Sequence, residues 1–106
     1  MSWTVICAKE DLLPGRGVAA LAGPVQIAIF LTPSLSLYAV GNLDPASGAC
    51  VLSRGILGTR AGTPVVASPM HKHAYDLATG RCLDDERLAV PVYPIRERDG
   101  LVEVGL

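Results

Sequence analysis

Two histidines, His71 and His73, carry the side chains best suited to binding a metal ion, and they lie two residues apart. On one face of a strand they would point the same way, with Asp76 or Cys82 as further candidate ligands. This spacing matches no closed structural zinc site, which draws its ligands from close pairs. We therefore interpret both histidines as loop residues near a partner surface, with a metal site as the alternative.

Cys50 and a run of glycines are the other features that suggest chemistry. No histidine lies near Cys50 in the sequence and no helix begins there to activate its thiol, so we expect a small, packed and inert side chain. Gly55, Gly58 and Gly62 resemble a phosphate-binding loop, but the Lys-Ser/Thr pair that should follow the last glycine is absent. We interpret these glycines as allowing a tight loop rather than as a nucleotide site.

The elements that position these residues read as antiparallel β structure, because short runs of β-branched and aromatic residues alternate with turn residues. Strands are predicted at Trp3–Cys7, Val18–Ala22, Val25–Leu31, Leu35–Val40, Val65–Ser68, His73–Leu77, Val92–Glu97 and Leu101–Val104. Gly23-Pro24 predicts a tight link between two strands, and Asp99-Gly100 predicts a hairpin because both residues tolerate positive φ. No stretch carries a helical stripe, so we expect at most one turn at Asp84–Arg87. Gly41–Gly62 and Ser68–Lys72 are predicted loops.

The predicted fold class is therefore all-β, a small antiparallel sandwich or barrel formed by residues 1–106 as one domain. Two loops at one end of such a scaffold are where binding sites are usually mounted. The sequence around these loops resembles the cluster-binding region of Rieske domains, over Leu37–Val40, Val65–His71 and Ala74–Gly80.

In true Rieske proteins the first loop offers Cys-x-His and the second Cys-x-x-His, with two cysteines on one iron and two histidines on the other. The resemblance places these four ligand positions at Asp44, Ala46, Ser68 and His71. Ala46 has no donor atom, and the hydroxyl of Ser68 is a weak ligand where a soft thiolate is needed. We expect a Rieske-like fold that cannot hold a [2Fe–2S] cluster.

A longer stretch is similar to the small subunit of assimilatory NAD(P)H-dependent nitrite reductase, over Asn42–Ala49, Val51–Gly58 and Ser68–Met70 with Lys72. This resemblance implies a large catalytic subunit as partner, carrying sirohaem, an iron–sulfur cluster and flavin, and reducing nitrite to ammonia with NAD(P)H. It implies that the present chain binds no cofactor, is not catalytic on its own, and supports or positions that partner. Candidate docking residues on the loops are Arg54, Arg60, Met70 and Lys72.

Composition agrees with a subunit role and argues against several other classes. A hydrophobic content of 50% with 18% charged residues predicts an exposed apolar patch for a partner. The net charge of −1 without a basic run argues against nucleic acid. Three cysteines without a C-x-x-C pair fit a reducing cytoplasm, and the longest apolar stretch, Gly17 to Leu31, is too short and interrupted to cross a membrane.

Two alternatives to the nitrite reductase subunit stay open at this point. One is an electron-transfer ferredoxin of the Rieske type, which would require an unusual cluster. The other is a cluster-free Rieske-like binding module of another oxidoreductase. His71 favours this second alternative, because tyrosine or another non-ligand is expected there in the nitrite reductase subunits.

Overall fold

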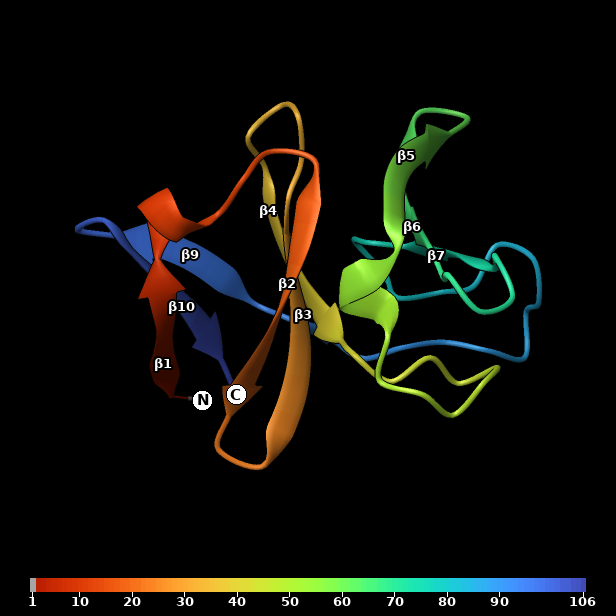
Figure 1. Cartoon of the computed structure of the whole chain (residues 1–106), viewed down its shortest axis with the longest axis horizontal. Coiled ribbons are helices and arrows are strands. Elements are labelled where there is room, and N and C mark those ends of the chain that lie inside the picture. Colours follow the sequence, from red (N-terminus) through yellow and green to blue (C-terminus); the bar gives the residue numbers. More distant parts are fainter. Residues whose placement is uncertain (1) are drawn as a thin grey trace.

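The computed structural model describes residues 2–106, and within this range short strands make up nearly all regular structure (Figure 1). The strands are β1 (Trp3–Ala8), β2 (Arg16–Ala22), β3 (Val25–Leu31), β4 (Leu37–Gly41), β5 (Ile56–Arg60), β6 (Thr63–Ala67), β7 (Ala74–Asp76), β8 (Val92–Tyr93), β9 (Ile95–Arg98) and β10 (Leu101–Gly105). The described helices are both short and of the 3₁₀ type, η1 (Lys9–Asp11) and η2 (Leu52–Arg54).

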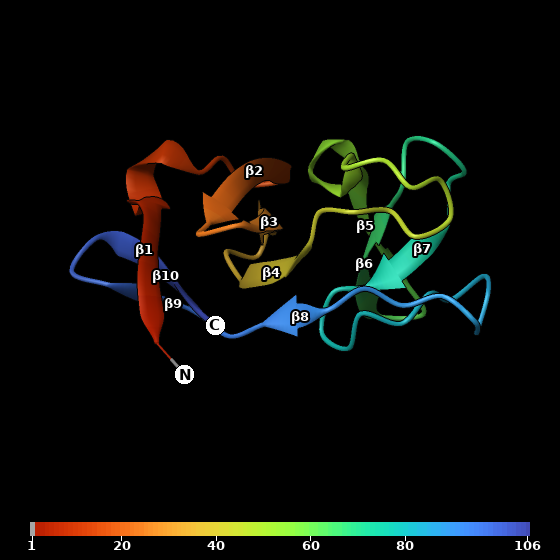
Figure 2. The same ribbon diagram turned by 90° about the horizontal axis from the view of Figure 1, so that it is seen from below.

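The strands form three antiparallel sheets, in the orders β1-β10-β9, β2-β3-β4-β8 and β5-β6-β7. In both views the four-stranded sheet lies between the other two, with β5, β6 and β7 at one end of the molecule and β1, β9 and β10 at the other (Figures 1 and 2). This arrangement confirms the predicted all-β antiparallel class.

The core consists of two apolar clusters, one on each side of β3. Ala28 and Phe30 of β3 face the first cluster, which reaches Leu52 of η2 and Tyr75 of β7. The second contains the alternate residues of β3 together with Val102 and Val104 of β10. Because successive strand residues point to opposite faces, a strand between two clusters is apolar at nearly every position. This explains the unbroken run from Ile27 to Leu31.

The two predicted tight turns are confirmed. Gly23-Pro24 joins β2 to β3, and Asp99-Gly100 joins β9 to β10 with φ of 54° and 80°. The predicted single strand Val92–Glu97 is wrong, because the chain changes sheets at Pro94: β8 pairs with β4, whereas β9 pairs with β10. Proline lacks the N–H that a continuous strand would need, so it suits this break.

The predicted loop from Gly41 to Gly62 is wrong in its second half. β5 occupies Ile56–Arg60 and pairs with β6, through a turn at Ala61 and Gly62 with φ of 53° and 82°. Of the glycines that suggested a loop, Gly58 lies within β5 and Gly62 in this turn. At Asp84–Arg87, where the sequence allowed at most one helical turn, the structure has no helix. The Leu88 amide donates to the Asp85 carbonyl, which closes a simple turn.

Candidate functional site

The candidate site is formed by two loops at the end of the molecule that holds β5, β6 and β7. Loop 1 (residues 42–51) follows β4, and loop 2 (residues 68–73) joins β6 to β7. Loop 1 is closed by the Asp44 amide donating to the Ala49 carbonyl (2.8 Å) and the Gly48 amide donating to the Asp44 carbonyl (2.7 Å). Loop 2 is closed by the Lys72 amide on the Ser68 carbonyl (2.9 Å). As predicted, residues 68–72 make a short turn between strands.

Asp44 lies at the centre of the site, with its side chain fully buried. Its Oδ1 accepts hydrogen bonds from the Ala46 amide (3.0 Å) and the Tyr75 hydroxyl (3.0 Å). Its Oδ2 accepts from the Ser68 hydroxyl (2.5 Å) and the Ser47 hydroxyl (3.1 Å). The donors come from loop 1, loop 2 and β7, so one carboxylate joins three segments of the chain.

These hydrogen bonds decide the charge state of Asp44. Burial on its own raises the pKa of the carboxyl, because a charge is costly away from water. Hydrogen bonds from four donors favour the ionised form and outweigh burial, so the pKa of Asp44 lies below its ordinary value. The centre of the site is therefore a buried anion at neutral pH.

Tyr75 and Ser68 are fixed as donors to this anion. Burial first, and then the hydrogen bond and charge of Asp44, raise the pKa of Tyr75 above its ordinary value, which keeps its hydroxyl proton in place. Ser68 is also buried, and besides donating to Asp44 its hydroxyl accepts from the Met70 amide (3.2 Å). Asp44 thus fixes the position of the Ser68 hydroxyl, and that hydroxyl in turn holds the Met70 amide of loop 2.

The other two predicted ligand positions contribute no side chain to this network. Ala46 takes part only through its amide, and His71 is exposed on loop 2. The imidazole of His73 lies with its centroid 6.1 Å from that of His71, and its Nδ1 is buried without a hydrogen bond in the described structure.

The other residues proposed as metal ligands have different partners. Asp76 accepts from the amides of Ala78 and Thr79, and Cys82 packs in the first apolar cluster. Within residues 2–106 no three His, Cys, Asp or Glu side chains are grouped so that they could hold a metal ion.

Cys50 contradicts the expectation of a packed side chain, because it is exposed on loop 1. It meets Leu43 only through an isolated backbone bridge, which leaves its side chain at the surface. The three glycines serve separate structural needs. A Cβ at Gly55 would lie 2.5 Å from the Ala67 carbonyl oxygen, Gly58 faces open space, and Gly62 sits in the β5–β6 turn.

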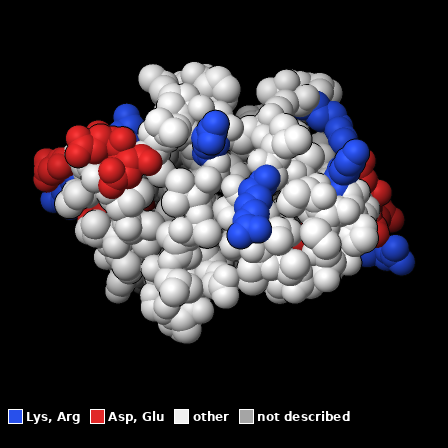
Figure 3. All heavy atoms as spheres, in the orientation of Figure 1, with Lys and Arg blue, Asp and Glu red and all other residues white. Residues whose placement is uncertain are grey.

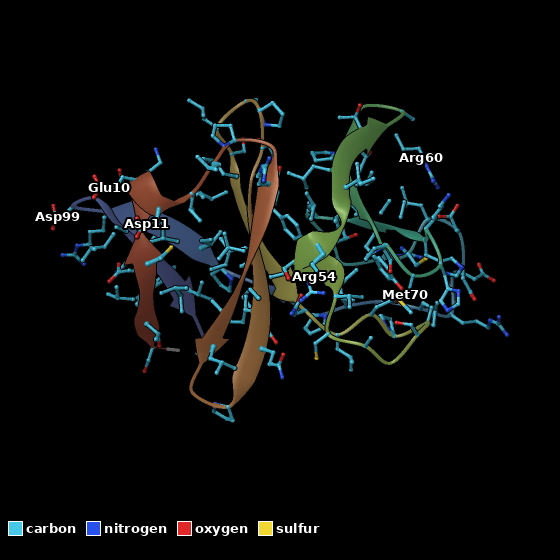
Figure 4. The ribbon with its side chains drawn as sticks, viewed as in Figure 1. Glu10, Asp11, Arg54, Arg60, Met70 and Asp99 are labelled. Atoms are coloured by element: carbon cyan, nitrogen blue, oxygen red, sulfur yellow. The ribbon has the colours of Figure 1, made fainter. Side chains whose placement is uncertain are left out.

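The candidate docking residues are not all brought together (Figure 4). Met70, 55% exposed, and the exposed Lys72 lie on loop 2. Arg54 ends η2 over the middle of the molecule, apart from Met70. Arg60 ends β5 and is held by Asp84 through an ion pair of 2.8 Å. Asp84 also accepts the Ala74 amide, so Arg60 braces the start of β7.

Sequence reasoning missed Tyr75 and Ser47 as members of the site. Ser47 could have been found, since a hydroxyl residue shortly after an aspartate favours a turn capped by the carboxylate. Tyr75 gave no such signal, because it meets Asp44 across 31 positions of sequence. Only the packing of β7 against loop 1 reveals it.

Comparison with known proteins gives a consistent picture. The sequence profile of the Rieske-like [2Fe-2S] domain family matches residues 2–105. The small subunit of nitrite reductase (NADH) from Salmonella typhimurium is 43% identical over 103 residues, which cover 96% of this chain and 95% of that protein. A crystal structure from Mycobacterium tuberculosis, described as an NADH-dependent nitrite reductase small subunit, has a TM-score of 0.93 and 50% identity, covering 97% of this chain and 93% of that one.

A further relative is much longer than this chain. The large subunit of nitrite reductase [NAD(P)H] from Klebsiella oxytoca is 40% identical over 103 residues, which cover 97% of this chain but only 11% of that protein. In that relative the counterpart of this chain is therefore one part of a larger polypeptide.

The [2Fe–2S] cluster in the family's name does not fit the residues present at this site. Asp44 and Ser68 are hydrogen-bonded to each other at the two positions where the resemblance to Rieske domains predicts the thiolates, and Ala46, at a predicted histidine position, offers no donor atom. The fold and the sequence nonetheless agree with the same group of relatives over nearly the whole chain. This chain belongs to the Rieske-like domain family and, within it, to the small subunits of NAD(P)H-dependent nitrite reductases.

Proposed function

We propose that this chain is the accessory subunit of an NAD(P)H-dependent nitrite reductase and transfers no electrons itself. The observation that carries the second part is the hydrogen bond between Asp44 and Ser68. It joins the two positions that would supply both thiolates of a Rieske centre, so the iron that they would hold has no ligands here. The chain then assists the reaction by binding, not by redox chemistry.

The proposed partner is the large catalytic subunit. The Klebsiella oxytoca large subunit, which contains a counterpart of this chain, supports this choice because fusion places the two parts in one molecule. In the proposed complex the large subunit carries sirohaem, an iron–sulfur cluster and flavin, and reduces nitrite to ammonia with NAD(P)H. The present chain supports or positions it in the cytoplasm, where its three free cysteines would stay reduced.

No helix within residues 2–106 has the length and apolar character needed to cross a membrane.

The proposed docking surface is the tip, which we define as the exposed side chains of Leu43, Met70 and Lys72 on loops 1 and 2. Leu43 and Met70 are large apolar side chains left in solvent, each about half exposed, at 50% and 55%. Large apolar side chains left exposed on two loops at the same end of the molecule suit a partner contact, and methionine adapts readily to the partner's surface.

Charge also favours docking by this end of the molecule. Glu10, Asp11 and Asp99 gather at the opposite end, and no ion pair of the described structure neutralises them (Figures 3 and 4). At the loop end Asp84 and Asp85 are paired with arginines, whereas Lys72 has no carboxylate partner among the ion pairs of residues 2–106. Lys72 would therefore suit an acidic partner surface at this end, and the exposed Arg54, over the middle of the molecule, would provide a second and separate basic contact.

The test is a pull-down with tagged chain from nitrate-grown source cells, followed by an absorption spectrum of the eluate. We expect a large co-eluting polypeptide with sirohaem and flavin bands and NAD(P)H-dependent consumption of nitrite. A colourless chain that elutes alone would contradict the proposal. Repeating the experiment with Arg54→Glu tests the basic contact: recovery of the large polypeptide should fall, and unchanged recovery would remove Arg54 from the interface.

A further inference from the structure

We infer that the Asp44 carboxylate does the structural work that a metal cluster would do, by acting as the cross-link that holds loop 1 and loop 2 together. A cluster joins its two loops because each supplies ligands to it. Here one buried anion collects donors from both loops instead. The inference goes beyond the proposed function and does not depend on it, since it concerns the isolated chain.

The connection between the loops depends on a single hydrogen bond. Among the hydrogen bonds of residues 2–106, only the one from Ser68 Oγ to Asp44 Oδ2 joins loop 1 to loop 2. Ser47 and the Ala46 amide tie the carboxylate to its own loop, and Tyr75 ties it to β7. Removing the carboxylate would therefore separate the two loops and leave Tyr75 without its acceptor.

The energetics favour a rigid link. A buried anion is stable only when its oxygens are well provided with donors, and here two hydrogen bonds reach each oxygen. Bonds to an ionised acceptor are stronger than neutral ones, and buried donors that lose their acceptor are costly. The link extends one step further, because Ser68 Oγ accepts from the Met70 amide. Asp44 thus determines where the backbone of loop 2 lies at Met70.

Asp76 shows what an ordinary turn-capping aspartate does in this chain. Like Asp44, it accepts from the amide two residues on, at Ala78, with a second bond from Thr79. Unlike Asp44, it is only partly buried, and the hydrogen bonds that its carboxylate accepts within residues 2–106 are all local. It therefore provides a matched control, with the same residue type and turn but no cross-link.

The experiment compares amide hydrogen exchange, measured by NMR, in the wild-type chain and in Asp44→Asn, Asp44→Ala, Ser68→Ala and Asp76→Asn. Loss of a charged, buried hydrogen bond should speed exchange at the Met70 and Lys72 amides about tenfold or more in the Asp44 and Ser68 variants. Exchange at Val102 and Val104 in β10 should stay at the wild-type rate. In Asp76→Asn, only amides near residues 78 and 79 should change.

Two results would overturn the inference. One is wild-type exchange at Met70 and Lys72 in folded Asp44→Asn and at Lys72 in folded Ser68→Ala. The other is an equal rise in exchange throughout the chain, which would make Asp44 a contributor to overall stability and not a link between loops. Should Asp44→Ala fail to fold, Ser68→Ala still decides the matter at the Lys72 amide, because it cuts the cross-loop bond and leaves Asp44 with three donors and Lys72 with its backbone acceptor. The Met70 amide loses its own acceptor in this variant, so it is compared only in the Asp44 variants.

A titration in loop 2 provides an independent readout. In the wild-type chain the amide shifts of Ser68 and Met70 should follow the ionisation of Asp44, although Asp44 is in the other loop. In Asp44→Asn this titration should vanish from loop 2. The other titratable groups around the site are the same in both chains: Tyr75, Cys82, His71, His73, Asp84 and Asp85. The difference between the titration curves of wild type and Asp44→Asn therefore isolates Asp44. An acidic titration of the Ser68 and Met70 amides, below about pH 4, that is the same in Asp44→Asn as in wild type would contradict the inference.

Discussion

The hydroxyl of Tyr75 donates a 3.0 Å hydrogen bond to Oδ1 of Asp44, and both side chains are completely buried. The bond ties β7, which follows loop 2 in the sequence, directly to loop 1. It also places a phenol that stays protonated next to a carboxylate that stays ionised, since their pKa values are shifted in opposite directions. The pair thus keeps one fixed arrangement of charge and proton over the whole neutral range.

Tyr75→Phe should lower the free energy of unfolding by about 1–3 kcal/mol, because it removes one donor from a buried anion without changing the shape of the ring. Urea unfolding at pH 7 measures this, and the slope with denaturant should be unchanged. Tyr93→Phe is the control, since the structure shows no hydrogen bond from its hydroxyl within the described chain. Equal stability of Tyr75→Phe and wild type would show that the bond contributes nothing.

Stability should decrease in acid partly through Asp44. Its pKa in the folded chain lies below the value of about 3.9 typical of unfolded chains, so ionised Asp44 stabilises the fold above that value. This contribution is lost as the pH falls through the folded pKa. Asp84 and Asp85 have lowered pKa values too, that of Asp85 at about 2, so wild type alone cannot separate them.

The difference between wild type and Asp44→Asn isolates the part due to Asp44. Unfolding should be followed from pH 7 to pH 2, and the stability gap between the two chains should be constant near neutrality and shrink below about pH 4. A gap that does not change with pH would mean that the Asp44 charge has no part in the stability of the fold.

Gly80→Ala should prevent folding or destabilise the chain by about 3 kcal/mol or more, because the new Cβ would clash with the carbonyl oxygen of Val90. Gly80 also has a φ of +81°, which strains any other residue. Gly23→Ala shares the positive φ but faces open space, so it should lose only about 1 kcal/mol. Thermal unfolding measures both, and similar losses would show that the backbone angle alone matters.

Met70→Asp should weaken binding to the large subunit about tenfold or more, because it puts a charge into the proposed apolar contact. The side chain is exposed, so the stability of the isolated chain should change little. Val5→Asp is the matched control: Val5 is 51% exposed on β1, at the end of the molecule opposite the loops (Figure 1). Affinity of the two variants for the purified large subunit gives the answer, and equal affinities would move the interface away from the tip.

Anaerobic incubation with ferrous iron and sulfide should leave the wild-type chain colourless after desalting. The prediction follows from the residues at the four ligand positions, of which only His71 has a ligand-type side chain suited to a Rieske centre. Iron analysis and the visible spectrum of the desalted chain provide the measurement. Two irons per chain with a reducible charge-transfer spectrum would contradict the proposal of a non-redox subunit and revive the electron-transfer alternative.

Local features of the sequence were sufficient for the class of the fold and for part of its topology. Asp99-Gly100 and Gly23-Pro24 determine tight turns through the backbone angles that these residues favour, whatever surrounds them. The run Ile27–Leu31 marks a strand buried on both faces. The residue types at positions 44, 46 and 68 argue against a cluster by themselves, because the ability to ligate iron depends on the chemistry of each side chain.

Tertiary structure decided what depends on neighbours distant in the sequence. β5 forms because β6 supplies its hydrogen bonds, although Gly58 within it and the flanking Gly55 and Gly62 favour a loop in isolation. The exposure of Cys50 depends on how loop 1 lies on the surface. The partners of Asp44 at Ser68 and Tyr75 are 24 and 31 residues away, and no periodicity encodes such contacts. The amino-acid sequence alone thus predicted which of the proposed ligand positions lack a ligand-type side chain, whereas only the packing of β7 and the two loops determined that the carboxylate of Asp44 is buried and collects donors from three segments.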